Sequence, residues 1–568
     1  MTLKQHAVLL GLAAFALLAA GNAAVAAPSP AAPPPGDDAF VKAVDAVMTE
    51  VYKPGQPGAA VIVRKDGRTL LRRAYGTADL ELGVAMEPDM IFRLGSITKQ
   101  FTAVSILMLA EQGKLALEDE VTKFLPDYPT QGRKITVENL LTHTSGIRSY
   151  TDLPEWLPLW RKDFTLKELI ELFKDKPMQF EPGERWAYCN SGYILLGAIV
   201  EKVSGQTYEE FVDAHIFKPL GMKHSCYGST ERVIPRRIPG YQMGNGAFVN
   251  APYLSMTQPY AAGSLLSNVD DLAVWSEAVF SGKLVGKKWL DRAFTPYRLK
   301  NGESTGYGYG WFIASDRGHR SVEHGGGING FLTYEMTFPE DGLFLAVLTN
   351  SAIEGRDPEP RAVKVARLAL GLAEPERKAV RLAAADLEPL VGVYEDAAKN
   401  EYDLTRDGDK LFAQRKGGAR NELLAASPAE FFLKDNPARF LVVRDAKGAV
   451  AGLRIEGRIG PAQVFTRTAR PLPSPRKEVS VNPKLYDLYV GEYELAPGFT
   501  ITIIKQGGRL LSRATGQPEV ELFPESETRF FLKVVDAQVD FVRDASGRVT
   551  SLVLHQGGQD LPAKKKTP

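Results

Sequence analysis

The sequence predicts an α+β protein in which an antiparallel sheet is flanked by helices and is followed by two small antiparallel β-barrel domains. Residues 38–372 supply the first part, because a helix, a hairpin, a long helical middle, a hairpin and a helix follow one another there. After residue 373 the chain changes to short alternating segments with Asp/Gly turns, which repeat at a fixed spacing. With 568 residues, the chain is long enough for several domains.

Two hairpins mark the sheet of the first part. Strand-like runs at 59–63 and 69–73 flank the turn Lys65-Asp66-Gly67. A second pair of apolar runs, 331–338 and 343–348, is joined by a Pro-Glu-Asp-Gly turn. The helices expected before and after these hairpins cover residues 38–52 and 361–372.

An internal repeat defines the second part. Gly392-Val393-Tyr394 recurs as Gly491-Glu492-Tyr493, and Phe431-Phe432-Leu433 recurs as Phe530-Phe531-Leu532, each 99 positions later. The constant offset means that the two copies carry no net insertion relative to each other. Short strand-like runs in copies of this length favour small barrels or sandwiches. The two barrels are expected over residues 386–470 and 484–568.

The N-terminus resembles an export signal. Lys4 gives a positive start, residues 7–20 are apolar, and Ala24-Val25-Ala26 is typical of a cleavage site. We therefore expect residues 1–26 to be a cleaved signal peptide and 27–37 to be an Ala/Pro-rich spacer. The mature protein is then expected to be periplasmic or secreted, without a stable membrane anchor.

Composition narrows the classes of partner and cofactor. The net charge of +1 disfavours nucleic acid, and 44% hydrophobic with 24% charged residues is typical of a globular protein. The seven histidines form no H-E-x-x-H pattern and no paired C-x-x-C occurs, so no metal or cofactor is expected. The two cysteines, Cys189 and Cys226, leave a single disulfide open.

The sequence Ser96-x-x-Lys99 is the first candidate catalytic motif. Positions three apart share a helix face, and an apolar pattern of helical period begins here. A lysine beside a serine can take its proton or stabilise the developing charge. The alternative is a simple helix N-cap serine. A second copy, Ser474-x-x-Lys477, lies in a proline-rich linker and is rejected.

A competing motif, Gly302-x-Ser304-x-Gly306, matches the nucleophile elbow of α/β-hydrolases. Such an elbow needs a hydrophobic strand before the serine, and none precedes Ser304. The lipase-like His324-Gly325-Gly326-Gly327 also stands downstream of the serine instead of upstream. We therefore reject this hypothesis.

Tyr188 is the second candidate. It lies with Cys189 and Asn190 between a turn-rich stretch and an apolar helix. A phenol has a pKa of about 10, which neighbouring cations would lower, so Tyr188 is a candidate base. The alternative is a half-buried aromatic residue.

In chain order, Ser96-x-x-Lys99, Tyr188-x-Asn190 and the segment beginning at His324 resemble the three motifs of the penicillin-recognising serine hydrolases. Further stretches are similar to the branch of class C β-lactamases, family VIII esterases and D-aminopeptidases. The resemblance implies a serine β-lactamase/penicillin-binding-protein-like catalytic domain. The third motif usually begins with lysine in true β-lactamases and DD-peptidases. His324 is instead similar to the D-aminopeptidase and esterase-like members, whose paired barrels the C-terminal repeats also resemble.

The resemblance also implies roles for the motif residues. Ser96 would be the acylated nucleophile, Lys99 would hydrogen-bond it, and Tyr188 would act as general base and then general acid. Asn190 would orient Lys99 and the substrate carbonyl. Whether Lys99 or Tyr188 takes the serine proton stays open.

The third motif would contact substrate. The backbone N–H groups of Ser96 and Gly327 would form the oxyanion hole, and His324 and Gly326 would line the substrate site. Because histidine has a pKa of about 6.5, His324 is expected to make activity pH-sensitive between about pH 5 and 8.

These expectations together indicate an exported serine hydrolase that forms a Ser96 acyl-enzyme with small esters, amides or D-amino-acid peptides. One alternative is a β-lactamase or DD-peptidase acting on penicillins or cell-wall peptides. Another is a catalytically retired protein that only binds a ligand. In each case the partner is a small molecule or a short peptide, and the oligomeric state stays open.

Overall fold

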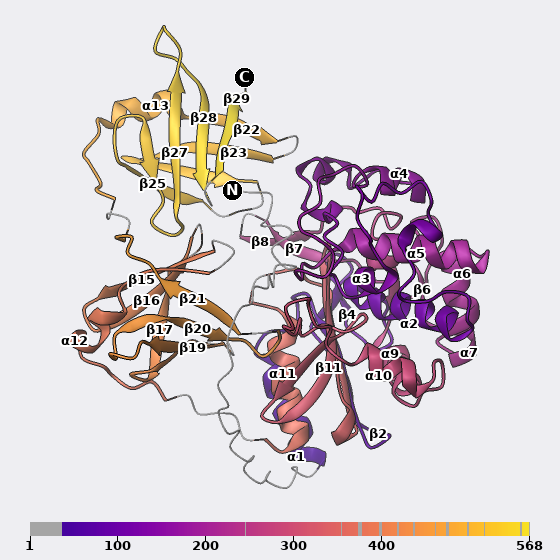
Figure 1. Cartoon of the computed structure of the whole chain (residues 1–568). Coiled ribbons are helices and arrows are strands. Elements are labelled where there is room, and N and C mark those ends of the chain that lie inside the picture. Colours follow the sequence, from indigo (N-terminus) through magenta and orange to yellow (C-terminus); the bar gives the residue numbers. More distant parts are fainter. Residues whose placement is uncertain are drawn as a thin grey trace.

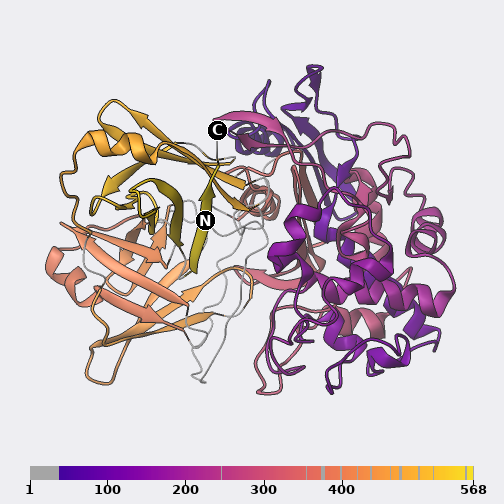
Figure 2. The same ribbon diagram turned by 90° about the horizontal axis from the view of Figure 1, so that it is seen from above.

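The computed structural model of the chain places a mixed helix and sheet region beside two β-barrels (Figure 1). It describes residues 37–566 apart from 245, 354, 373–377, 397–399, 417, 419, 435–437, 461, 473–475, 497–498, 516, 518 and 557–558. The predicted signal peptide (1–26) and all but the last residue of the predicted spacer lie outside the described residues. Seen from above, the barrels lie to one side of the helical region (Figure 2).

The central sheet is antiparallel and has the strand order β10-β11-β12-β13-β1-β2. Both predicted hairpins are in it, so its two halves come from the two ends of the domain. The strands are β1 (Ala59–Lys65), β2 (Arg68–Tyr75), β10 (Phe312–Asp316), β11 (His319–Ile328), β12 (Phe331–Phe338) and β13 (Leu343–Thr349).

Helices cover both faces of this sheet, as the predicted α+β arrangement requires. Two of them, α1 (Asp37–Thr49) and α11 (Pro358–Leu370), pack together on one face around their own apolar cluster. The larger core lies on the other face. Its helices are α2 (Thr98–Glu111), α3 (Val137–Leu141), α4 (Leu166–Glu171), α5 (Asn190–Ser204), α6 (Tyr208–Val212), α7 (Lys218–Leu220), α8 (Tyr260–Gly263), α9 (Val269–Phe280) and α10 (Lys287–Ala293).

Short strands that the sequence did not predict connect these helices. They form small sheets outside the central one. They are β3 (Thr77–Asp79), β4 (Val84–Ala85), β5 (Phe92–Arg93), β6 (Cys226–Tyr227), β7 (Tyr241–Gly244), β8 (Ala247–Asn250) and β9 (Leu265–Ser267).

The C-terminal repeats form two closed eight-stranded antiparallel barrels, which confirms that part of the predicted fold. The first follows α12 (Ala384–Leu387) and contains β14 (Gly392–Glu395), β15 (Glu401–Asp407), β16 (Lys410–Arg415), β17 (Arg420–Ser427), β18 (Glu430–Leu433), β19 (Arg439–Arg444), β20 (Val450–Glu456) and β21 (Gln463–Arg467). The second follows α13 (Tyr486–Tyr489) and contains β22 (Gly491–Ala496), β23 (Phe499–Gln506), β24 (Arg509–Ala514), β25 (Val520–Pro524), β26 (Arg529–Phe531), β27 (Ala537–Arg543), β28 (Val549–Gln556) and β29 (Gln559–Lys565).

The repeat extends to individual contacts. Tyr394 donates its hydroxyl hydrogen bond to the Leu390 carbonyl at 2.6 Å, and its counterpart Tyr493 donates to the Tyr489 carbonyl at 2.7 Å. Each hydroxyl ties the first strand of its barrel to the helical turn before it. A phenol hydroxyl buried in a small core needs a hydrogen-bond partner, and both barrels provide one in the same way, with a backbone carbonyl four residues earlier.

Candidate active site

Ser96 lies in the 3₁₀ turn Gly95–Ile97, which leads directly into α2. The prediction that Ser96 lies at the start of a helix is therefore confirmed. Gly95 has φ 56°, and a Cβ there would lie 2.9 Å from the backbone nitrogen of Gly327. Only glycine permits this approach. The close contact seats the serine turn directly against strand β11.

Lys99 is buried one helical turn after Ser96 and makes three polar contacts. Its Nζ donates to Asn190 Oδ1 at 2.8 Å and to the Ala262 carbonyl at 2.8 Å, and it lies 3.1 Å from Ser96 Oγ, within hydrogen-bond distance. Lys99, Asn190 and Ala262 lie on α2, α5 and α8, so three helices meet at this nitrogen. Burial lowers the pKa of Lys99 well below its ordinary range. A neutral amine has a lone pair that can accept the Ser96 proton.

The phenol of Tyr188 faces the same centre. Lys99 Nζ lies 4.7 Å from the centroid of the Tyr188 ring. Within the described residues, the buried Tyr188 hydroxyl has no hydrogen-bond partner. Burial raises the pKa of this phenol above its usual range, and the nearby Ser96 hydroxyl opposes that to a smaller extent. The expectation that neighbouring cations lower its pKa was therefore wrong, because desolvation is the largest effect and raises it.

Asn190 is the first residue of α5, where it fixes Lys99. Its side-chain nitrogen donates to Thr151 Oγ1 at 3.0 Å, which orients the amide oxygen toward Lys99. The neighbouring Cys189 is a free, buried thiol that donates to the Ile147 carbonyl, and Cys226 is also free. Burial raises the pKa of Cys189 to about 12, so it is an unreactive core residue.

His324 lies on β11 but does not behave as the sequence suggested. It is buried, its Nε2 lies 3.0 Å from the Tyr307 hydroxyl, and its Nδ1 lies 2.5 Å from the Gly325 carbonyl. The carbonyl can only accept, so Nδ1 carries the proton and Nε2 accepts from Tyr307. Burial, followed by the charge of Lys99, lowers the pKa of His324 to about 3. The expected titration between about pH 5 and 8 is therefore wrong, since His324 stays neutral there.

Gly326 and Gly327 allow β11 to pack against the serine turn. A Cβ on Gly326 would lie 1.9 Å from the Leu94 carbonyl oxygen, so no other residue fits. Thr333 on the neighbouring strand donates to the same carbonyl at 2.7 Å. Gly327 follows, with its backbone nitrogen beside Gly95. The structure thus brings all seven predicted site residues to the junction of α2, α5 and β11.

Two residues with no assigned role complete the arrangement. Tyr307 contacts His324, as described above, and His143 packs its ring 4.3 Å from the Tyr188 ring centroid. His143 has φ 58°, and its Nδ1 accepts from the Cys189 backbone N–H at 3.1 Å. Burial lowers the pKa of His143 well below its usual value. It is neutral and holds the Tyr188 loop through this hydrogen bond to Cys189.

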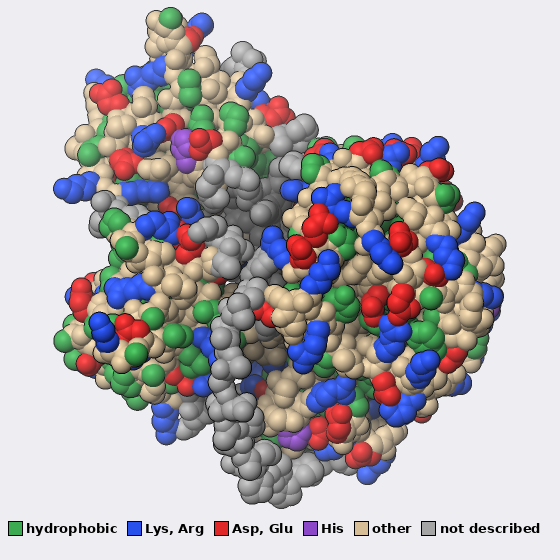
Figure 3. Space-filling view, viewed as in Figure 1, with side chains coloured by type: hydrophobic (Ala, Val, Ile, Leu, Met, Phe, Trp, Pro, Cys, Tyr) green, Lys and Arg blue, Asp and Glu red, His purple; other side chains and the backbone are tan. Residues whose placement is uncertain are grey.

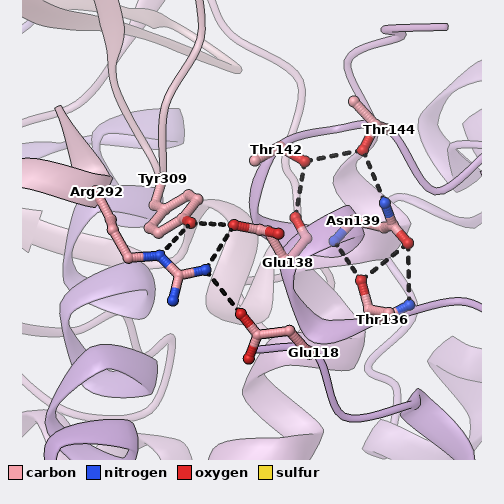
Figure 4. A network of polar contacts seen from close by, with 8 residues as sticks. All are labelled: Glu118, Thr136, Glu138, Asn139, Thr142, Thr144, Arg292 and Tyr309. Atoms are coloured by element: carbon pink, nitrogen blue, oxygen red, sulfur yellow. Dashed lines mark hydrogen bonds and ion pairs between the residues drawn. The ribbon is translucent and has the colours of Figure 1, made fainter. Parts of the chain in front are cut away.

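A polar network supports the loop that carries His143 (Figure 4). Arg292 donates to Glu138 on α3 at 2.9 Å and to Glu118 at 3.0 Å, and Tyr309 also donates to Glu138. On the other side of the short helix, Thr142 contacts the Glu138 carbonyl and Thr144. The remaining members, which cap the start of the helix, are Thr136 and Asn139. The network fixes both ends of α3 and so fixes the loop after it.

Other types of site find no support in the described part of the chain. No three His, Cys, Asp or Glu side chains there are grouped so that they could hold a metal ion. None of its helices is long and apolar enough to cross a membrane. Ser304 precedes β10 in the chain and forms an isolated antiparallel bridge with Arg298. Its hydroxyl accepts from the Gly306 N–H at 3.3 Å. It is not at a strand-to-helix elbow, which agrees with rejecting the α/β-hydrolase hypothesis.

Comparison with known proteins gives the same result as the motifs. Residues 39–370 match the Beta-lactamase family, and residues 475–565 match a domain of unknown function (DUF3471). The chain is 25% identical over 531 residues to Penicillin-binding protein 4* of Bacillus subtilis (strain 168), covering 90% of this chain and 96% of that protein.

Two solved structures are similar as well. The octameric penicillin-binding protein homologue from Pyrococcus abyssi is 28% identical with a TM-score of 0.53, covering 76% of this chain and 99% of the other. A D-stereospecific amidohydrolase from Streptomyces sp. is 28% identical with a TM-score of 0.51, covering 60% of this chain and all of the other (100%). The chain is a serine hydrolase that belongs to the beta-lactamase family.

Proposed function

We propose that this protein hydrolyses small esters, amides or D-amino-acid peptides through an acyl-enzyme formed on Ser96. The observation that carries the proposal is the contact of Lys99 Nζ with Ser96 Oγ at 3.1 Å, in surroundings that lower the lysine pKa. A buried neutral amine beside a hydroxyl is an arrangement that activates a nucleophile.

The geometry favours Lys99 over Tyr188 as the first proton acceptor. The pKa of the lysine is lowered and that of the phenol is raised, so the amine loses its proton more readily than the phenol and is the better candidate base. In the proposed first step, Ser96 Oγ attacks the substrate carbonyl as its proton passes to Lys99. Tyr188 then donates its proton to the leaving group, and its phenolate recovers a proton from Lys99, which carries the one taken from Ser96.

The oxyanion of the intermediate would be held by the backbone N–H groups of Ser96 and Gly327. The Gly95–Gly327 contact supports this role, because it brings the serine turn and β11 together. Removing one such donor typically costs about 10²–10³ in kcat.

The substrate proposal rests on His324. A neutral, buried imidazole cannot attract a substrate carboxylate as a lysine ammonium would, which disfavours penicillins as main substrates. Similarity to a D-stereospecific amidohydrolase favours D-amino-acid amides and peptides. The alternative, a β-lactamase or DD-peptidase, is favoured by the similarity to Penicillin-binding protein 4*.

We also propose export to the periplasm or the cell exterior, on the basis of the signal-like residues 1–26. A small-molecule or short-peptide partner suits the surface. On the face drawn in Figure 3, Lys/Arg and Asp/Glu side chains are interspersed, without a broad stripe of one sign among the described residues. Nucleic acids bind to continuous basic surfaces.

A substrate panel tests the proposal. Short-chain nitrophenyl esters, D-alanyl and L-alanyl anilides and a chromogenic cephalosporin are compared for the wild type and Ser96→Ala. We expect hydrolysis of esters or D-alanyl anilides that is lost in Ser96→Ala, together with fluorophosphonate labelling of the wild type. A protein that hydrolyses no panel member and takes up neither a fluorophosphonate nor a fluorescent penicillin would be a retired, ligand-binding member.

A further inference from the structure

The connection between β20 and β21 of the first barrel reaches the catalytic sheet. Its Arg458 is only 4% exposed and contacts three residues of the catalytic domain. Nη1 donates to both carboxylate oxygens of Glu323 at 2.6 and 2.7 Å, and Nη2 donates to the Tyr334 hydroxyl at 2.7 Å and to Glu359 at 2.8 Å. These partners belong to β11, β12 and α11, so one barrel side chain joins three elements.

Two of these partners adjoin the third motif. Glu323 directly precedes His324 on β11, and its side chain is 0% exposed. Because side chains alternate along a strand, Glu323 points to the face opposite His324. Tyr334 is paired with Gly325, and a Cβ on that glycine would lie 3.0 Å from the Tyr334 ring. Arg458 thus supports β11 from behind, directly at Glu323 and through Tyr334 at Gly325.

A second contact from the same barrel loop reaches the other side of His324. Gly306 has φ 68°, and a Cβ there would lie 2.8 Å from the Cα of Gly460. The next residue is Tyr307, whose hydroxyl contacts His324 Nε2. The barrel loop therefore approaches His324 by way of Glu323 behind the strand and Tyr307 beside it.

The Arg458–Glu323 ion pair is buried, whereas the Arg439–Glu430 pair of the same barrel is partly exposed. Arg439 with Glu430 is 45% and 30% exposed, and pairs of that kind contribute little. Glu323 is fully buried, and removing one partner of a buried pair leaves an uncompensated charge. Burial raises the pKa of the Glu323 carboxyl, which Arg458 opposes. The planar guanidinium of Arg458 reaches Glu323, Tyr334 and Glu359 at once. A lysine ammonium is a point charge and could not contact all three.

We propose that Arg458 is a positioning residue for the active site, through which the first barrel sets the placement of β11 from Glu323 to Gly327. The proposal rests on the function proposed above, because it concerns the strand that would supply the Gly327 oxyanion donor. A hydrogen bond from the Gly327 N–H to the oxyanion would be strongest in the transition state. A misplaced Gly327 should therefore lower kcat more than it raises KM.

Kinetics of the full-length protein test this. Arg458→Gln and Arg458→Lys are compared with Arg439→Gln, a control that removes an exposed Arg–Glu pair of the same barrel. With a nitrophenyl ester, we expect kcat of Arg458→Gln to fall about tenfold or more with little change in KM. Arg458→Lys keeps the charge and should recover part of the loss, and Arg439→Gln should match the wild type.

Hydrogen exchange separates this inference from the proposed function. Peptides covering residues 319–338 should exchange faster in Arg458→Gln than in the wild type or Arg439→Gln, whether or not a substrate has been found. Unchanged exchange there would overturn the inference, as would a kcat equal to that of the wild type. If Arg458→Gln does not fold, the same two comparisons are made with Arg458→Lys. Absence of turnover in the wild type counts against the proposed function alone.

Discussion

Lys99 Nζ contacts Ser96 Oγ and, at the same time, the side chain of Asn190 and a helix carbonyl. Replacing Lys99 by arginine places a permanent positive charge there and removes the proton acceptor, because a guanidinium does not deprotonate in proteins. We expect Lys99→Arg and Lys99→Met to lower kcat/KM for a nitrophenyl ester by about 10²–10⁴. Full activity in Lys99→Arg would exclude the lysine as base.

The pH profile follows from the lowered pKa of Lys99. The free amine is the active form, so activity should rise with pH as Lys99 loses its proton and then level off. Because the pKa is lowered, the rise should be complete well below the ordinary lysine value of about 10.4. A profile of kcat/KM against pH checks this, and activity that rises only near that value contradicts it.

Tyr188→Phe tests the proposed general acid. A poor leaving group needs its proton, whereas nitrophenolate leaves without one. We therefore expect the substitution to lower kcat for a D-alanyl amide by about 10²–10⁴ and for a nitrophenyl ester by much less. Fluorophosphonate labelling of Ser96 should persist. Equal losses on both substrates would instead indicate that Tyr188 activates the serine.

His324 should link stability to pH. Its pKa is about 3 in the folded protein and about 6.5 when unfolded, so the unfolded state binds the extra proton between these values. The contribution of His324 to stability is therefore full above pH 6.5 and is lost as the pH falls toward 3, at up to about 1.4 kcal/mol per pH unit. His324→Gln should show a shallower fall in urea-unfolding free energy over this range, and an unchanged slope would contradict the buried, neutral imidazole.

Gly326→Ala tests the close packing of β11 on the serine turn. The new Cβ would meet the Leu94 carbonyl at 1.9 Å, so strand and turn must separate. We expect a loss of about 1–3 kcal/mol in stability and a lower kcat. Gly508→Ala, where no heavy atom lies within 4 Å of the added carbon, serves as the control. A Gly326→Ala protein with normal activity would show that the turn tolerates displacement.

Much of the fold and the site could be predicted from the sequence because the signals are local. The hairpin turns and the Ser96-x-x-Lys99 motif each lie within a short stretch of sequence, and the repeated segments recur at a constant offset of 99 positions. The chain order of the motifs was sufficient to identify the family. The short strand-like runs of the repeats indicated small barrels or sandwiches, and the structure shows closed barrels.

The protonation states could not be predicted, because they depend on burial. Tyr188 and His324 have ordinary sequence neighbours, and only packing raises the pKa of the first and lowers that of the second. Tyr307 and Arg458 carry no local motif, and Arg458 lies 135 positions from Glu323 in the chain. Long-range polar contacts of this kind become visible only when the fold brings the segments together.

Peptide mapping of the acyl-enzyme by mass spectrometry tests the central claim most directly. After rapid acid quenching of a reaction with a nitrophenyl ester or a fluorophosphonate, we expect a single adduct on Ser96 in the wild type and none in Ser96→Ala. An adduct on a different residue, or undiminished hydrolysis by Ser96→Ala, would contradict the account.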